Sequence, residues 1–339
     1  MIFAADKRTL GAAALVIGVL AGLPLVVDDF YLSVLALIFL YALVGIAWNL
    51  MMGYAGQLSL GHALYFGLGA YIVAVLSEKF GVTPWFGMVP AFLVAALAGT
   101  IIGALGFRFG VRGVYFALLT IAFAEFARIL FEHWDYVGRT GGFFLTALTE
   151  RNRPLVSLRG GALFFYYALL LTMLAAWFVS IALVRSRLGY LWRAVREDED
   201  AARALGVPAF RVKLLAVAIS AGITGIAGGC FALMNGSLFP DSAFGMRLSI
   251  DLIIAPIVGG LGTLFGPILG AFIVVPLNEI AKELGQATGV NGLNLLIYGV
   301  LLLGVVVVAP SGAWPWIARR LGLGKTTETA VDPSKDPAP

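Results

Sequence analysis

Long apolar stretches, separated by short polar connections, run through most of the 339-residue chain. A helix needs roughly 20 apolar residues to cross the hydrocarbon core of a bilayer, and only helices and closed barrels can span it. The pattern therefore predicts an all-α, polytopic integral membrane protein with about ten transmembrane helices. The predicted spans cover residues 10–27, 31–52, 60–77, 84–107, 110–133, 161–184, 212–235, 248–258, 264–280 and 291–309.

Three of these segments are less regular than the others. Residues 248–258 are too short to cross alone, and glycines surround the connection to residues 264–280. We expect these two segments to form either a full hairpin or a broken, partly re-entrant element, since non-helical backbone at membrane depth must be covered by protein or water. Residues 10–27 follow a basic pair, Lys7 and Arg8, but show no obvious signal-cleavage site. We interpret them as an uncleaved first span rather than a signal peptide.

The composition excludes a soluble protein. Hydrophobic residues make up 60% of the chain and charged residues 12%, against about 25% charged residues in an ordinary globular domain. The net charge of +4 does not indicate a nucleic-acid partner, because the basic residues cluster beside membrane segments. The single cysteine, Cys230, can form neither an intramolecular disulfide nor a cysteine-based metal cage. We expect no metal site and no cofactor on this chain.

Residues 185–213 are the one strongly charged part of the chain, with eleven of its 42 Lys, Arg, Asp and Glu residues. With ten spans and the N-terminus inside, cytoplasmic segments hold 15 Lys and Arg residues and external segments 7, with Arg128 inside a span. This bias predicts cytoplasmic N- and C-termini. It makes residues 134–160 the long external loop. Residues 1–310 are then one transmembrane domain, and residues 311–339 a largely disordered cytoplasmic tail.

The charged loop contains a predicted helix of about two turns. Acidic residues at 198–200 suit the first turn of a helix, and the alanines and leucine that follow are good helix formers. Gly206 and Pro208 are placed to end the helix. We expect Ala201 and Ala202 to offer a small-residue surface to a soluble partner, oriented by the flanking charges. The alternative is a solvated linker without a partner.

The tail contains Gly324-Lys325-Thr326, which invites a nucleotide-binding interpretation. A phosphate-binding loop of that type needs a glycine five residues before Gly324, where the chain has Arg319, and it needs a preceding strand. The match fails. If ATP drives this protein, ATP hydrolysis takes place on a separate chain.

Several glycine-patterned segments resemble one family. Residues 53–71 (GYAGQLSLGHALYFGLGAY), 203–222 (RALGVPAFRVKLLAVAISAG) and 258–271 (VGGLGTLFGPILGA) look like the branched-chain amino acid permeases of bacterial ABC importers. The pattern at residues 119–125 (LTIAFAE) and the span count are similar to the M-type subunit of the high-affinity uptake system. The resemblance covers about residues 30–310.

The resemblance implies a permease subunit that moves branched-chain or similar hydrophobic amino acids inward across a bacterial cytoplasmic (inner) membrane. It implies four kinds of partner besides lipid: a second permease subunit, two cytoplasmic ATPase subunits, a periplasmic substrate-binding protein and the amino-acid substrate. Two alanines followed by a glycine resemble the coupling loop that the ATPases contact. The implied coupling residues are Asp200, Ala201, Ala202, Arg203 and Gly206.

A candidate translocation pathway or gate begins where polar residues interrupt an apolar region. Broken helices of this kind line substrate pathways in transporters. A polar turn with close-packed glycines is the alternative explanation of the same residues. We expect the side chain of His62 to pack and not to transfer protons. In the predicted span 110–133, Glu125 and Arg128 are three positions apart and share a helix face. They could form an ion pair that holds spans together, or they could be part of the pathway. The pathway candidates are Gly53, Tyr54, Gln57, Ser59, Gly61, His62 and Glu125.

Other glycines fit close contacts between helices, where small residues let two backbones approach. They are Gly99, Gly103, Gly106, Gly222, Gly225 and Gly228.

Three rival functions remain open at this point. Within the same importer class, the substrate could be urea or a short amide. From another class, an ion-coupled secondary transporter would work alone on a sodium or proton gradient. A membrane enzyme ranks last, because no Ser/His/Asp, His-rich or paired-carboxylate cluster is readable.

Overall fold

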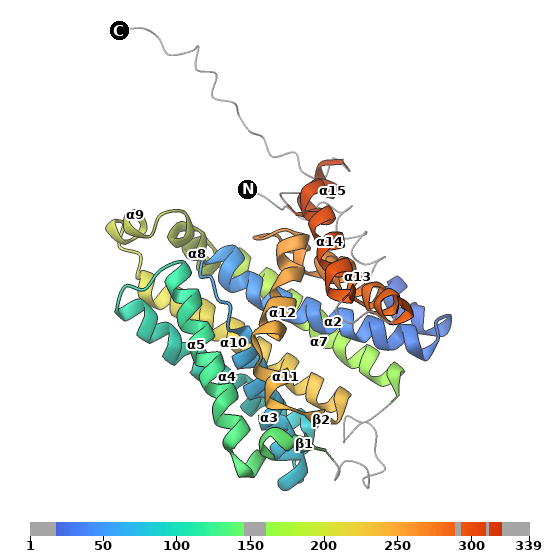
Figure 1. The fold of residues 1–339 in the computed structure, drawn as a ribbon. Coiled ribbons are helices and arrows are strands. Elements are labelled where there is room, and N and C mark those ends of the chain that lie inside the picture. Colours follow the sequence, from blue (N-terminus) through green and yellow to red (C-terminus); the bar gives the residue numbers. More distant parts are fainter. Residues whose placement is uncertain (1–17, 146–160, 289–292, 310–311, 321–339) are drawn as a thin grey trace, which may run out of the picture.

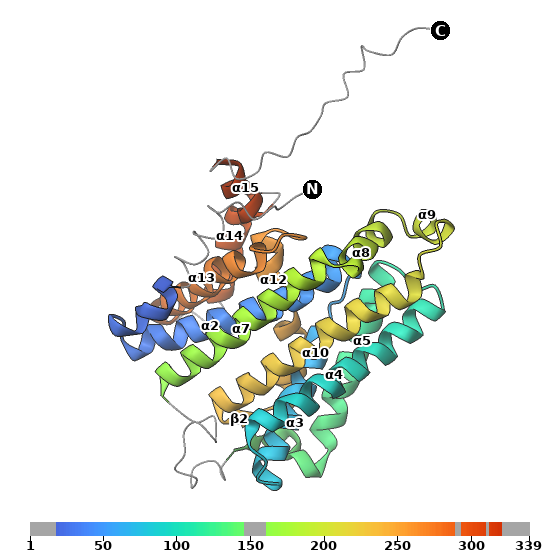
Figure 2. The same ribbon diagram turned by 180° about the vertical axis from the view of Figure 1, so that it is seen from behind.

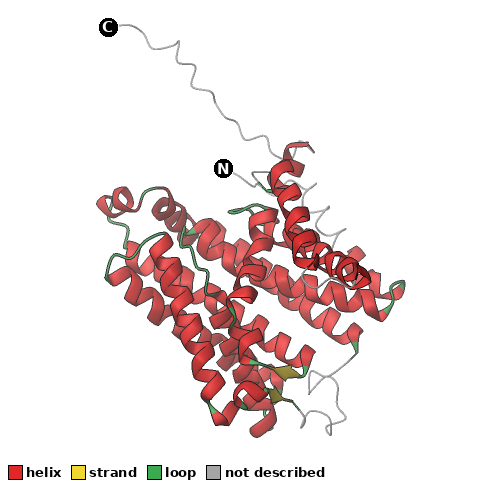
Figure 3. Cartoon of the chain, in the orientation of Figure 1, coloured by secondary structure: helices red, strands yellow, loops and turns green. Residues whose placement is uncertain are grey.

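The computed structural model describes residues 18–145, 161–288, 293–309 and 312–320, and nearly all of them are helical (Figures 1 and 3). Four short helical turns and two two-residue strands accompany the α-helices. The helices are α2 (Asp29–Asn49), α3 (His62–Lys79), α4 (Pro84–Arg108), α5 (Val114–His133), α7 (Ala162–Arg185), α8 (Arg187–Glu197), α9 (Glu199–Ala204), α10 (Ala209–Asn235), α11 (Pro240–Phe244), α12 (Met246–Gly259), α13 (Gly266–Thr288), α14 (Leu293–Val308) and α15 (Ala313–Arg320). The short turns are η1 (Leu23–Leu25), η2 (Leu50–Tyr54), η3 (Asp135–Val137) and η4 (Arg139–Gly141).

The predicted all-α membrane architecture is confirmed. Among the described residues, six helical segments are long and apolar enough to cross a membrane. Helices α3, α13 and α14 occupy three further predicted positions. Residues 10–17 of the predicted first span lie outside the described residues, so the count of ten spans stays a prediction. The six segments are Asp29–Tyr54, Pro84–Arg108, Val114–His133, Ala162–Arg185, Ala209–Asn235 and Pro240–Gly259.

Helix α10 packs against α4 and α3 and also contacts α2 (Figure 2). Small residues allow this approach: a Cβ atom at Gly225 would lie 2.7 Å from the carbonyl oxygen of Ala91 in α4. A Cβ atom at Gly228 would lie 1.9 Å from the carbonyl oxygen of Phe66 in α3. On α4, a Cβ atom at Gly99 would lie 2.7 Å from that of Ala221. The predicted glycine contacts between spans are therefore present.

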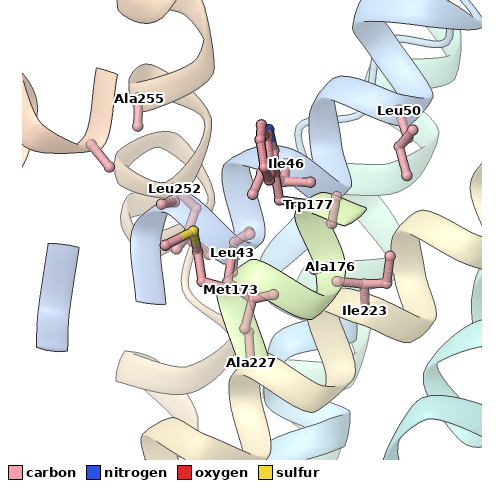
Figure 4. Packing of buried hydrophobic residues seen from close by; sticks show 14 of the residues in the cluster. Leu43, Ile46, Leu50, Met173, Ala176, Trp177, Ile223, Ala227, Leu252 and Ala255 are labelled. Carbon is pink, nitrogen blue, oxygen red and sulfur yellow. The ribbon is translucent and has the colours of Figure 1, made fainter. Parts of the chain in front are cut away.

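A second group of helices packs around α2. Residues of α2, α7, α10 and α12 interdigitate there (Figure 4), with Leu43 and Ile46 of α2 buried among side chains of the other three helices. Trp177 of α7 adds a hydrogen bond at the edge of this core, where its Nε1–H donates to the carbonyl oxygen of Leu264 at 2.9 Å. This bond fastens α7 to the loop between α12 and α13.

Helices α12 and α13 pack against each other as a tight hairpin. A Cβ atom at Gly259 would lie 1.7 Å from the Gly266 carbonyl oxygen, and one at Gly270 would lie 1.8 Å from that of Ala255. The hairpin turn covers residues 260–265, called the glycine turn below. The chain also breaks before α12, where the extended backbone of Gly245 separates it from α11. The eighth predicted span is thus the broken segment Pro240–Gly259.

The two ends of the bundle carry different connections. Helices α8 and α9 lie at one end, and the antiparallel strands β1 (Phe143–Phe144) and β2 (Ser237–Leu238) lie at the other (Figures 1 and 2). The strands attach the predicted external loop to the end of α10, and residues 146–160 of that loop lie outside the described residues. The segment predicted as the start of a disordered tail forms α15, and its Trp314 packs on Phe265 with ring centroids 4.7 Å apart.

Candidate functional site

The predicted interruption between the second and third spans is real. Helix α2 ends in the π-helical turn η2, and the chain is then non-helical until α3 begins. We call residues 50–61 the helix break. Its backbone groups find partners within the protein: the Leu60 N–H donates to Thr120 Oγ1 at 3.1 Å, and the Ser59 carbonyl accepts from Trp48 Nε1 at 2.8 Å. Such pairing is what non-helical backbone requires at membrane depth.

The side chain of His62 is fully buried and packs, as expected. Its Nδ1 lies 3.1 Å from Ser59 Oγ, and its Nε2 lies 3.0 Å from Ser220 Oγ on α10. The next residue along the chain donates its N–H to Ser249 Oγ of α12 at 2.9 Å. Three helices therefore meet at the start of α3 through hydroxyl contacts. Ser220 and Ser249 were not predicted, although lone hydroxyls in apolar spans signal a partner on another helix.

Asn49, the last residue of α2 before the helix break, joins the end of α2 to the glycine turn. Its Oδ1 accepts from the Gly262 N–H at 2.8 Å, and its Nδ2 donates to the Thr263 carbonyl at 2.8 Å. Gly53 leaves room for this bridge, because a Cβ atom there would lie 2.0 Å from Asn49 Oδ1. Asn49 was not among the residues predicted for the site. An asparagine in an apolar span needs partners for both its amide donor and its carbonyl acceptor, and this need was the available signal of a contact with another segment.

The remaining pathway candidates of the helix break lie within the same region. Tyr54 is buried, with the guanidinium of Arg193 5.9 Å from its ring centroid. Gln57 is half-buried, and its Nε2 donates to the Ala55 carbonyl at 2.9 Å. Gly61 is buried against α5, where a Cβ atom would lie 2.1 Å from the Thr120 carbonyl oxygen. In this conformation the helix break is mostly packed inside the protein.

Glu125 is the most exposed of the pathway candidates. Its side chain is 47% exposed, and its Oε2 lies 2.6 Å from Arg128 Nε, so the expected ion pair is present. Arg128 also pairs with Glu132 and lies 3.9 Å from Asp241 of α11. Glu125 borders a hollow of about 40 Å³ together with Leu60, Ile121, Ala124, Phe244, Met246 and Ser249. This is well below the roughly 300 Å³ of a small-molecule pocket.

The predicted helix in the charged loop is α9, and its end signals behave as expected. Asp198 Oδ1 accepts from the N–H groups of Asp200 and Ala201, both at 2.9 Å, which caps the helix start. Gly206 follows the helix with a left-handed φ of +86°. One expectation is wrong: Ala202 is only 3% exposed, because it faces the bundle and not solvent. Ala201 is exposed, as are Ala204 and Leu205.

A cluster of charges fixes α9 to the bundle. Glu199 Oε1 lies 2.8 Å from Nζ of Lys213, a residue of α10 with 2% of its side chain exposed, and 2.5 Å from Arg203 Nη2. Arg112, from the α4–α5 connection, reaches both Glu199 at 3.6 Å and Asp200 at 3.3 Å. The hydrogen bond from Arg112 lowers the pKa of the Asp200 carboxyl. We call these five residues the α9 cluster.

Helix α8 was not predicted from the sequence. Ser186 caps its start by accepting from the Leu188 N–H at 3.2 Å. Trp192 is fully buried, and its Nε1–H donates to the Val212 carbonyl of α10 at 2.9 Å. Apolar side chains at 188, 191, 192 and 195 have helical spacing and were the available signal. The basic residues of this segment indicated a charged loop instead.

A comparison with known families bears on these features. The family model for the branched-chain amino acid transport system permease component matches residues 30–306. The chain belongs to that permease family. It is 30% identical over 325 residues to LivM, the high-affinity branched-chain amino acid transport system permease protein of Escherichia coli, with 88% of this chain and 73% of LivM covered. The predicted similarity to the M-type subunit is thereby confirmed.

More distant relatives belong to the same group of permeases. BraD of Pseudomonas aeruginosa, a high-affinity branched-chain amino acid transport system permease protein, is 22% identical over 80% of this chain and 90% of its own length. A probable LivH permease protein of Methanocaldococcus jannaschii is 24% identical over 72% of this chain and 79% of its own length. No solved structure matches the chain significantly.

Proposed function

We propose that this chain is the transmembrane permease subunit of an ATP-driven importer that carries branched-chain amino acids inward. The observation that carries this proposal is the family match over residues 30–306, which contains the helix break, α8, α9 and the glycine turn. Identity to LivM over 88% of the chain supports the substrate class. The chain is a transport subunit and not an enzyme, with ATP hydrolysis on separate subunits and no cofactor of its own.

The two ends of the bundle suit two different partners. Two ATPase subunits act from the cytoplasm, one of them on α9, where Ala201, Arg203, Leu205 and Gly206 are accessible. A periplasmic binding protein delivers substrate at the β1–β2 end. The protein sits in the cytoplasmic membrane with both termini inside, as the basic residues favour. Salt bridges of the α9 cluster then carry a push on α9 to α10 and the α4–α5 connection.

A second permease subunit completes the assembly. Glu125 is 47% exposed on a helix long and apolar enough to span the membrane. A carboxylate facing lipid is costly, so this face of α5 is expected to meet water or another protein. We place it toward the second permease and the substrate pathway. The hollow beside Glu125 would then become part of a larger cavity between two chains.

The decisive experiment is uptake of radiolabelled leucine into proteoliposomes. The full set contains this chain, the second permease, the ATPases and the binding protein. We expect leucine uptake to require ATP on the side of the ATPase subunits and to require every partner. Unlabelled isoleucine and valine should inhibit this uptake. Inhibition by urea or short amides alone would assign the rival substrate class. Uptake by this chain alone on a sodium or proton gradient would contradict the proposal.

The coupling role of α9 gives a sharper test, the substitution Gly206→Glu. Gly206 is exposed with open space around it, but its φ is +86°, so a glutamate there strains the end of α9 and adds charge where an ATPase would dock. We expect normal membrane insertion and ATP hydrolysis with uptake lowered at least tenfold. Gly110→Glu is the strain-matched comparison, because Gly110 also has a left-handed φ of +70° and open surroundings but lies outside α9, in the α4–α5 connection. Coupled uptake by the Gly206 variant would remove α9 from the mechanism.

A further inference from the structure

Arg196 connects the α8–α9 end of the protein to the transmembrane bundle. It lies in the last turn of α8, three residues before α9 begins. Its Nη1 donates a hydrogen bond to the carbonyl oxygen of Gly53, 143 residues earlier in the chain and inside the helix break. Within the described residues, no carboxylate pairs with Arg196. Its specific polar contact is therefore with backbone of the bundle.

Two glycines make room for this side chain. A Cβ atom at Gly56 would lie 3.0 Å from Arg196 Cγ, so the helix break passes directly over the base of the arginine side chain. A Cβ atom at Gly262 would lie 3.0 Å from Arg196 Nη1 and 3.0 Å from the Gly53 carbonyl oxygen. Both glycines also have left-handed φ angles, +69° and +70°. One side chain thus meets the helix break and the glycine turn together.

Neighbouring contacts fix the elements on both sides of Arg196. Asn49 holds the glycine turn to the end of α2 through two hydrogen bonds of 2.8 Å. Trp192, one helical turn before Arg196, holds α8 to α10. Because α9 follows α8 after a single residue, Asp198, a displacement of α9 displaces the end of α8. Arg196 lies where that displacement would reach the non-helical backbone of the helix break, which deforms more easily than a helix.

We propose that Arg196 is a positioning residue that transmits movement of α8 and α9 to the helix break and the glycine turn, so that both change conformation together during transport. This inference rests on the proposed function, which supplies the ATPase that moves α9. A single hydrogen bond to a carbonyl can break and re-form in each cycle. Arg196 then acts through backbone and does not touch the substrate.

The test compares Arg196→Gln and Arg196→Lys with the matched control Arg187→Gln in the complete reconstituted importer. Arg187 lies on the exposed side of α8. We expect Arg196→Gln to lower leucine uptake at least tenfold while ATP hydrolysis stays within twofold of wild type. Arg196→Lys, which keeps a cationic donor of shorter reach, should recover part of the uptake, and Arg187→Gln should change neither activity. Unchanged uptake per ATP hydrolysed in Arg196→Gln would overturn the proposal.

A second readout separates this role from simple stabilisation and from failure of the proposed function. Leu261 of the glycine turn is 37% exposed, so Leu261→Cys in a Cys230→Ala background offers a thiol for labelling. We expect ATP to change its labelling rate severalfold when Arg196 is present and not in Arg196→Gln. Equal changes in both would refute transmission through Arg196. A wild-type complex that hydrolyses ATP and shows the labelling change without leucine uptake would contradict the proposed substrate alone.

Discussion

At the scale of single residues, buried polar side chains join helices that are far apart in the chain. His62 contacts Ser59 and Ser220, and Asn49 contacts both Gly262 and Thr263. Each bond is modest, but a buried donor or acceptor without a partner costs about 1–3 kcal/mol. These residues therefore specify how the helices fit together, beyond the bulk apolar packing around them.

Ser220→Ala should destabilise the protein by about 1–3 kcal/mol, because it leaves Nε2 of the buried His62 without its hydroxyl partner. The single cysteine, Cys230, is buried, so a thiol-reactive dye reports unfolding as the detergent-solubilised protein is heated. Ser242→Ala removes an exposed hydroxyl and serves as control. If both variants unfold at the same temperature, the histidine contact contributes nothing.

Gly61→Ala should be more damaging than its small volume suggests. The new Cβ would lie 2.1 Å from the Thr120 carbonyl oxygen, a backbone atom that cannot rotate away. The start of α3 and α5 must then separate, which costs about 1–3 kcal/mol or more. Gly299→Ala in α14 meets nothing within 4 Å and should be neutral or stabilising by up to about 1 kcal/mol. The same thermal assay ranks the two variants, and equal midpoints would contradict this reading.

At the scale of elements, α9 is too short to be stable alone, so its caps and charges decide where it lies. Asp198 caps its first turn, and Gly206 ends it. Glu199 pairs with Lys213 at the start of α10, a buried partner that places α9 firmly against the bundle. One side of α9 is consequently left exposed, while Glu199 on the other side contacts Lys213 and Arg112.

The contact between Asp200 and Arg112 should survive ordinary changes of pH. The hydrogen bond from Arg112 holds the pKa of Asp200 below its ordinary value of 3.8. A carboxyl with a lowered pKa contributes its stabilisation above that ordinary value and loses it as the pH falls further. A spin label at Leu205→Cys, in a Cys230→Ala background, should therefore show constant mobility from about pH 5 to pH 8 and rising mobility in more acidic buffer.

The same spin label at position 205 should also report the effect of high salt on the ion pairs of the α9 cluster. Exposed ion pairs weaken when the screening length falls to about 3 Å at 1 M salt. Mobility of the label at Leu205→Cys should then increase at neutral pH. The Arg112→Gln variant is expected to be mobile already at low salt. A label whose mobility changes between pH 5 and pH 8 would point to a different titrating group.

At the scale of the whole molecule, the orientation in the membrane decides which partner meets which end. The basic residues predict that α9 faces the cytoplasm. Leu205 is 87% exposed, so Leu205→Cys in a Cys230→Ala background should react with an impermeant maleimide only in inside-out vesicles. Phe144→Cys on β1, 53% exposed at the opposite end, should react only in right-side-out vesicles. The reverse pattern would contradict the assignment of both partners.

The sequence predicted most helices because their length, apolarity and glycine or proline ends are local properties. The break between α2 and α3 and the extent of α9 followed from short segments such as Gly53–Gly61 and Asp198–Gly206. Helix α8 escaped prediction although its apolar spacing was visible, because its charges suggested an exposed loop. Ala202 was placed on the wrong side of α9, since the side that faces the bundle depends on where α10 and Arg112 lie.

What the sequence alone determined is a membrane protein of packed helices, interrupted where glycines and polar residues cluster. Tertiary structure alone decided which distant groups meet: His62 with Ser220, 158 residues apart, and Arg196 with Gly53, 143 residues apart. The physical reason is that a polar group buried among apolar helices is costly without a partner, while many hydroxyls and carbonyls could supply one. Only the packing of the helices selects among them.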